Sequence, residues 1–184
     1  MEQESLDQKQ LEEINTILTS LNRMKRLNNN LLLLSKIRNN QFIDNKEINI
    51  NETIKEVLDN FEGLIDHKNI TLSLEEKDKF TIRINPDLAH IMITNLIKNA
   101  IVHNVEGGEL KIKLSPDSII ISNDGLKPEH ADDIFSRYYS HSDNKQSLGL
   151  GLSLVKSVID LYNLDIEYKY DNRHTITIRQ KKIK

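Results

Sequence analysis

The sequence predicts an α+β fold in which a two-layer α/β sandwich follows one long N-terminal helix. Residues 11–40 contain neither glycine nor proline, and their apolar residues recur at helical spacing. From residue 47 onward, short apolar runs with strand character alternate with longer helical stretches, an order typical of helices packed on one face of a mixed sheet. With 184 residues, the chain is long enough to bury one substantial core in addition to the helix.

The N-terminal stretch predicts a helix about 45 Å long at roughly 1.5 Å per residue. Its apolar residues follow a 3-4-3 spacing at Leu11, Ile14, Leu18 and Leu21, which repeats between residues 24 and 34. Such a stripe needs a partner, which is either another helix or the domain that follows. We expect this helical unit to span residues 1–41, and a second unit to span residues 47–184 after a short linker.

The elements of the second unit follow from apolar periodicity and turn residues. Its first long apolar helix begins at Asn85, because a capping side chain precedes Pro86 at the first helical position and Asp87 just after it. The other elements predicted are a helix at 51–67, a helix at 152–161, and strands at 47–50, 70–74, 80–84, 110–114, 118–122, 165–170 and 174–179.

Two side-chain amides interrupt the apolar run of the helix that follows Asn85. Asn95, Asn99 and His103 recur at intervals of four residues and therefore share one helix face. An amide oxygen is a neutral, hard ligand suited to Mg²⁺, which takes its remaining ligands from water and phosphates. The alternative is a solvated polar face, but two amides inside an apolar run need partners.

A second cluster ends the apolar strand at residues 118–122. Asn123, Asp124 and Gly125 form a turn there, and a glycine allows a planar ligand to approach the backbone closely. Considered alone, this sequence is more typical of an ordinary turn than of a ligand site.

A third cluster places glycines at the start of the helix predicted for residues 152–161. Gly149, Leu150, Gly151 and Leu152 bring free backbone N–H groups to a helix N-terminus, where anions bind. Neither a P-loop nor a dinucleotide fingerprint fits these residues, and a flexible loop is the alternative to a phosphate site.

In combination the clusters resemble the ATP-binding domain of bacterial sensor histidine kinases, in the GHKL superfamily. Asn95, Asn99 and Ala100 match the N-box of that family, and residues 134–139 are similar to its F-box. The resemblance implies the Bergerat-type sandwich, with Asn99 holding Mg²⁺ and Asn95 positioning phosphates. It also implies that Arg137 faces the γ-phosphate or the phosphoacceptor helix, where a guanidinium balances developing charge.

The same resemblance assigns the other two clusters. Residues 149–152 look like the G2 box that surrounds the phosphates, and residues 126–148 would form a lid over ATP. Asn123 stands where the family's G1 box has an aspartate that reads adenine, and no second glycine follows Gly125. An asparagine keeps an acceptor oxygen but lacks the charge, so we expect Asn123 to accept a hydrogen bond from the adenine amino group. The resemblance also implies that His103 lines the nucleotide pocket.

The N-terminal helix resembles the second helix of the kinase dimerisation and phosphotransfer hairpin. None of the six histidines has the sequence context of the family's phosphoacceptor, so we expect that histidine to lie on a helix absent from this chain. The resemblance implies γ-phosphoryl transfer to that histidine, relay to a response-regulator aspartate and homodimerisation through the helical region. The resemblance further implies that the chain is the cytoplasmic portion of a membrane-anchored sensor kinase. A regulatory pseudokinase and an anti-sigma-factor serine kinase of the same fold are alternatives.

Composition restricts the other classes of function. The net charge of −3 and the pI near 6.1 give no electrostatic footprint for nucleic acid. No apolar run approaches the roughly 18 residues that span a bilayer, so we expect no membrane contact by these residues. The absence of cysteine excludes zinc sites with thiolate ligands. His67 and His174 are expected to be surface residues.

Overall fold

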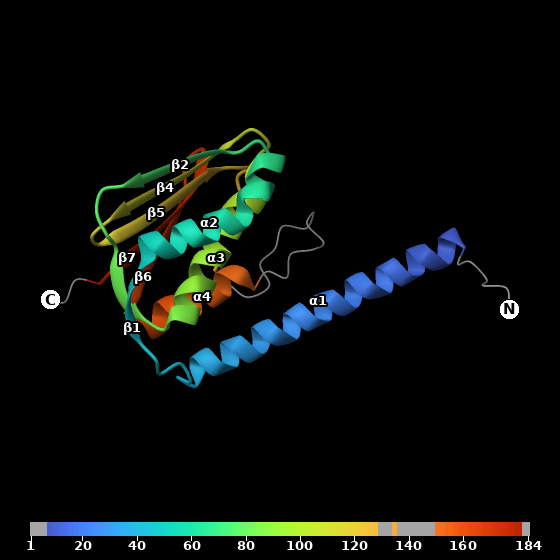
Figure 1. Ribbon diagram of the computed structural model, residues 1–184, viewed down its shortest axis with the longest axis horizontal. Coiled ribbons are helices and arrows are strands. Elements are labelled where there is room, and N and C mark those ends of the chain that lie inside the picture. Colours follow the sequence, from blue (N-terminus) through green and yellow to red (C-terminus); the bar gives the residue numbers. More distant parts are fainter. Residues whose placement is uncertain (1–6, 129–133, 136–149, 182–184) are drawn as a thin grey trace.

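Three helices cover one face of a five-stranded mixed sheet in the computed structural model of the protein, and no described element covers the other face (Figure 1). The structure describes residues 7–128, 134–135 and 150–181. The strands, in sheet order, are β2 (Thr71–Glu76), β4 (Glu109–Ser115), β5 (Ser118–Asp124), β7 (Arg173–Gln180) and β6 (Leu164–Tyr170). The covering helices are α2 (Ile50–His67), α3 (Pro86–Val102) and α4 (Gly151–Leu161). The predicted two-layer sandwich is confirmed.

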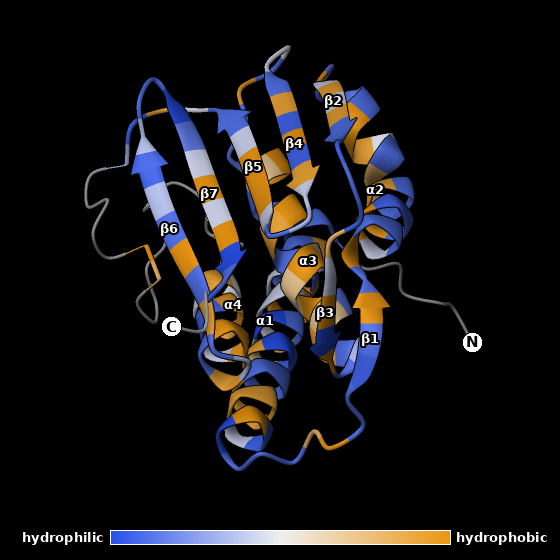
Figure 2. Ribbon diagram, turned by 90° about the vertical axis from the view of Figure 1, so that its left-hand side faces the viewer, coloured by the Kyte–Doolittle hydropathy of each residue, from blue (hydrophilic) through white to orange (hydrophobic). Residues whose placement is uncertain are grey.

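Strand register decides which side chains face the helices. Strand β5 pairs antiparallel with β4 and β7, and Ile121 lies between Ile112 and Ile176. All three side chains are buried beneath the helices. Because side chains alternate along a strand, Asn123 and its β7 partner His174 belong to the same helix-covered face. Figure 2 shows the alternating hydrophobic and hydrophilic bands along these strands.

The uncovered face of the sheet carries paired charges in place of a second layer of helices. Glu75 on β2 lies 2.6 Å from the Nζ of Lys111 and 3.2 Å from the Nζ of Lys113, both on β4. These partners lower the pKa of Glu75, first through hydrogen bonds. The ion pairs keep this face polar and leave the apolar core entirely on the helix side.

A separate two-stranded antiparallel sheet departs from the expectation of one sheet. It pairs β1 (Lys46–Asn49) with β3 (Thr81–Ile84). The predicted strands at 47–50 and 80–84 therefore exist, but they do not join the main sheet. The amide of buried Asn51, at the start of α2, accepts a hydrogen bond from the Phe80 N–H (2.9 Å) and so connects α2 to the segment before β3.

Helix α1 (Gln8–Arg38) is 31 residues long and extends away from the sandwich (Figure 1). Its C-terminal part packs on α4, where Leu34 and Ile37 are buried. Apolar side chains nearer its N-terminus are exposed, including Leu18 (51%) and Leu21 (56%). None of the described helices combines the length and apolar composition needed to cross a membrane.

Asparagine ends three of the four helices that the structure describes. Asn40, Asn69 and Asn163 follow the C-caps of α1, α2 and α4 with φ of 49°, 52° and 52°. Asparagine tolerates this left-handed conformation better than other residues with a side chain. The many asparagines of this chain therefore serve partly as helix stops.

Candidate functional site

Helix α3 begins where the sequence predicts, at the cap formed by Asn85. The Oδ1 atom of Asn85 accepts hydrogen bonds from the N–H groups of Asp87 (3.0 Å) and Leu88 (3.3 Å). Its own N–H donates to the hydroxyl of Tyr162 (3.1 Å), just past the end of α4. The cap therefore fixes the start of α3 and also connects it to α4.

Asn95, Asn99 and His103 form a half-buried polar stripe along α3, between neighbours buried in the core. The Nδ2 atom of Asn95 donates to the Ile91 carbonyl (2.8 Å), which leaves its Oδ1 atom directed toward α4. A Cβ atom added to Gly151 would lie 2.9 Å from that oxygen. The asparagine of the first cluster and the glycine of the third are therefore in direct contact.

The first turn of α4 presents backbone N–H groups beside this contact. Leu150 is the N-cap and offers no side-chain hydrogen bond, and the helical ladder begins with Leu154 N–H donating to the Leu150 carbonyl (3.0 Å). The N–H groups of Gly151 and Leu152 have no acceptor within the helix. Such a helix start binds anions, and Gly151 removes the side chain that would cover it.

The C-terminal end of α3 is held by Lys68, which the sequence analysis did not identify. Its Nζ donates to the carbonyl oxygens of Ile101 (2.9 Å), Val102 (3.0 Å) and Asn104 (2.8 Å). Burial lowers the pKa of Lys68, and Glu106 opposes this shift. A cation at a helix C-terminus also complements the helix dipole. Lys68 therefore fixes the backbone on both sides of His103.

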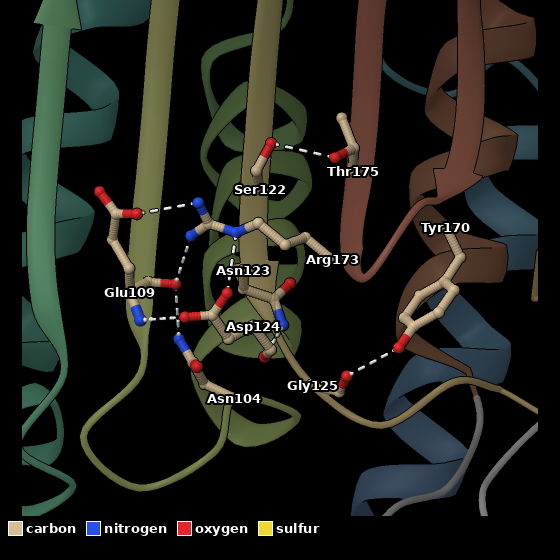
Figure 3. Close-up of polar contacts among 9 residues, drawn as sticks. All are labelled: Asn104, Glu109, Ser122, Asn123, Asp124, Gly125, Tyr170, Arg173 and Thr175. Atoms are coloured by element: carbon tan, nitrogen blue, oxygen red, sulfur yellow. Dashed lines mark hydrogen bonds and ion pairs between the residues drawn. The ribbon is translucent and has the colours of Figure 1, made fainter.

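The turn after β5 carries a buried amide, because Asn123 is only 5% exposed. Its Nδ2 atom donates to the Asp124 carbonyl (2.8 Å), and Oδ1 is the acceptor atom of the same amide (Figure 3). An acceptor oxygen in this position suits the exocyclic amine of adenine.

The neighbouring carboxylate of Asp124 is committed to structure. It accepts from the Glu109 N–H (2.7 Å) and forms an ion pair with Arg173 (2.8 Å), which also pairs with the Glu109 carboxylate at 2.8 Å (Figure 3). These contacts join the ends of β4, β5 and β7. Asn123 is therefore the residue of this turn that remains suited to a ligand.

Gly125 lies in a space too small for any side chain. A Cβ atom there would lie 2.6 Å from two ring atoms of His174 and 2.7 Å from the His103 carbonyl oxygen. The Tyr170 hydroxyl donates to the Gly125 carbonyl (3.2 Å). The end of α3, the turn after β5 and strand β7 therefore meet at Gly125.

Predicted site residues therefore meet at both ends of the α3 stripe. Gly151 lies beside Asn95 at one end, Gly125 lies beside His103 at the other, and Asn99 is between them. Two predicted residues, Arg137 and Gly149, lie outside the described residues, as does most of the predicted lid.

The expectation that His174 is a surface residue is wrong, because it is half-buried and contacts Gly125. Its alternation with the apolar residues of β7 was the available signal. Within the part of the chain that the structure describes, no group of three His, Cys, Asp or Glu side chains could hold a metal.

A family model supplies the class of the protein. Residues 84–182 match the model for the "Histidine kinase-, DNA gyrase B-, and HSP90-like ATPase". The chain belongs to this ATPase family, and its matched segment contains α3, the turn after β5 and the N-terminus of α4. The family supports ATP as the nucleotide of the site.

A curated relative is similar to this chain over most of the chain's length. The chain is 34% identical over 172 residues to the heme sensor protein HssS of Staphylococcus aureus strain Newman, a match that covers 89% of this chain and 37% of HssS. The chain therefore spans little more than a third of the curated relatives that it matches.

Solved structures show the same fold. The Acinetobacter baumannii histidine kinase AdeS matches with a TM-score of 0.74 and 21% identity, over 96% of this chain and 85% of that chain. The catalytic domain of histidine kinase ThkA matches with a TM-score of 0.64 and 26% identity, over 74% of this chain and 94% of that chain. The chain thus contains an ATPase domain of the histidine-kinase type.

Proposed function

We propose that this chain supplies the ATP-binding catalytic part of a sensor histidine kinase. The γ-phosphorus would form a bond to a histidine imidazole nitrogen outside this chain as its bond to the β–γ bridging oxygen breaks and ADP leaves. The phosphoryl group would then pass to an aspartate of a response regulator. The observation that carries the proposal is the contact between Asn95 and Gly151, which unites a ligand-binding amide face with an open helix N-terminus.

The roles of the residues follow from their positions. The acceptor oxygen of Asn123 would read adenine at one end of α3, where His103 lines the pocket. At the other end, Asn95 and the N–H groups beginning at Gly151 would hold the phosphates. We include Leu150, Leu152, Gly149 and Arg137 in this phosphate region from the motif match. Catalysis would rest on positioning and on charge stabilisation.

Asn99 is the proposed ligand of Mg²⁺. Its side chain is half-buried, and its amide makes no hydrogen bond to any residue that the structure describes. A neutral amide oxygen beside a phosphate-binding helix fits a hard cation that takes most of its ligands from phosphates and water. When bound, Mg²⁺ neutralises charge on the phosphates. Asn99 therefore serves to place the nucleotide's phosphates on α3.

Replacement of Asn99 by alanine tests the site. We expect calorimetry to show that the wild-type chain binds ATP with Mg²⁺, and that Asn99→Ala binds at least about ten-fold more weakly, the loss of one charge-assisted contact. Removal of Mg²⁺ should weaken wild-type binding and leave the variant almost unchanged. Asn60→Ala is the matched control, because Asn60 is an exposed asparagine on α2.

Binding that depends on neither Asn99 nor Mg²⁺ would show that the site assignment is wrong. Activity is measured separately, by mixing the chain with a separately made hairpin helix that bears the acceptor histidine. ATP binding without transfer to that helix would favour the pseudokinase alternative. The similar proteins described above are a heme sensor protein and histidine kinases, so the serine-kinase alternative is not favoured.

We further propose that α1 pairs with α1 of a second copy of this chain. Its exposed residues Leu11, Ile14, Leu18 and Leu21 repeat at helical spacing along one stripe. A stripe of this kind favours association through a self-complementary two-fold contact.

Light scattering over the micromolar range should show concentration-dependent association of the wild-type chain. Replacing Leu18 and Leu21 together by glutamine should shift the mass toward the monomer, because both side chains are more than half exposed (51% and 56%) in one copy. Lys36→Gln is a control on the same helix, since Lys36 is also exposed but polar. A wild-type chain that is strictly monomeric over this range would refute the pairing.

A further inference from the structure

We propose that His174 is a base-binding residue of the nucleotide site, which contacts the adenine ring. The inference rests on the proposed function, because it requires that Asn123 reads adenine. It adds a residue that lies outside the three sequence clusters.

Strand register places His174 beside the adenine-reading amide. His174 on β7 pairs directly with Asn123 on β5, and both belong to the helix-covered face of the sheet. Directly opposed side chains in an antiparallel pair have Cβ atoms about 5 Å apart. A purine whose amino group reaches the Asn123 acceptor therefore lies next to the imidazole.

The imidazole fills the space beside Gly125 and so lies against the turn that carries Asn123. Two ring atoms of His174, Cδ2 and Nε2, occupy the side-chain space of Gly125, and each would be 2.6 Å from an added Cβ atom. The His103 carbonyl oxygen closes the same space from α3, at 2.7 Å. The ring is thus packed against the turn that carries Asn123 and against the residue expected to line the pocket.

Two tyrosines of β6 hold the ring in one orientation. The Tyr168 hydroxyl lies 2.8 Å from Nδ1 of His174, and the Tyr170 ring meets the imidazole edge-on with a centroid distance of 5.1 Å. The Tyr170 hydroxyl also donates to the Gly125 carbonyl. A ring fixed by several partners is preorganised, so little conformational entropy is lost when a planar base packs against it.

The first measurement is ADP binding in the presence of Mg²⁺, by calorimetry, with four chains. We expect His174→Phe to weaken ADP binding by about ten-fold, because a phenyl ring cannot bond to the Tyr168 hydroxyl and is larger than the imidazole that fills the space beside Gly125, so the ring against which the base packs is displaced. Tyr168→Phe removes only the hydroxyl that orients the ring, and we expect an effect of about three-fold. Thr175→Val is the matched control, because Thr175 is the next residue of β7 and lies on the opposite face, where it bonds to Ser122. We expect its affinity to stay within two-fold of wild type.

The second measurement observes the contact itself. Saturating ADP should give nuclear Overhauser effects between the adenine H2 or H8 proton and the ring protons of His174, whose signals are identified by their loss in His174→Phe. A purely structural role for the ring would not produce them.

The outcomes separate the two proposals. If wild type binds no ADP, the proposed function fails. If wild type binds ADP but shows no such Overhauser effect, or if His174→Phe binds with wild-type affinity, only the role of His174 fails. Should His174→Phe not fold, the Overhauser effect and the affinity of Tyr168→Phe decide the question.

Discussion

Replacing Lys68 with methionine should lower the free energy of unfolding by about 2–3 kcal/mol, the range for hydrogen bonds to a charged group and for carbonyls left without a partner. The Nζ of Lys68 donates to three carbonyl oxygens at 2.8–3.0 Å around the C-terminal end of α3. Methionine keeps the apolar stem and removes the donors. Urea denaturation measures the effect, and the slope of the transition should not change.

Lys55→Met is the matched control for this experiment. Lys55 lies within α2, whose C-cap is Lys68, is 54% exposed and forms an ion pair with Glu76. Exposed ion pairs contribute between zero and about 1 kcal/mol, so this variant should remain close to wild type. Equal stabilities for the two variants would contradict the role assigned to Lys68.

The pKa of Lys68 adds a dependence on pH with a defined sign. Burial lowers this pKa below the usual lysine value of 10.5, so the folded chain releases the proton at lower pH than the unfolded chain does. In the window just below 10.5, the unfolded state therefore binds more protons, and stability rises with pH. The free energy of unfolding of wild type minus that of Lys68→Met should rise with pH in this window. The titratable groups that both chains share contribute equally to the two values and therefore cancel.

Sequence alone predicts the parts of the site that depend on local signals. Asn85 and Pro86 mark the start of α3 because capping involves only the next three residues, and the structure confirms the cap. The shared face of Asn95, Asn99 and His103 follows from the period of a helix. The glycine of α4 is also recognisable, since it directly precedes an apolar-periodic helix.

Contacts between distant residues are the parts that sequence could not supply. Lys68 lies 33 to 36 residues from the carbonyls that it holds, and its neighbours do not distinguish it from an exposed lysine. The same holds for Arg173, whose ion pair with Asp124 depends on the β5–β7 register. Alternation along β7 could have placed His174 on the covered face, but only the pairing of the two strands places it opposite Asn123.

Gly125→Ala should destabilise the fold by about 2–3 kcal/mol and abolish measurable nucleotide binding. The added Cβ would be 2.6 Å from the His174 ring and 2.7 Å from the His103 carbonyl oxygen, and atoms do not approach that closely without displacement. Overpacking of this kind costs about 1–3 kcal/mol. The carbonyl belongs to backbone held by Lys68, so it cannot move freely. The turn must shift instead, and Asn123 shifts with it.

Gly63→Ala separates this steric effect from the general effect of replacing a glycine. Gly63 lies within α2, and a Cβ there would meet no atom within 4 Å. Alanine stabilises an open helical position by about 0.5–1 kcal/mol, so this variant should be more stable than wild type and bind ADP normally. Urea denaturation and calorimetry on both variants provide the comparison. If Gly125→Ala binds ADP like Gly63→Ala, the turn after β5 does not form the base pocket, and the adenine-reading role of Asn123 must be abandoned.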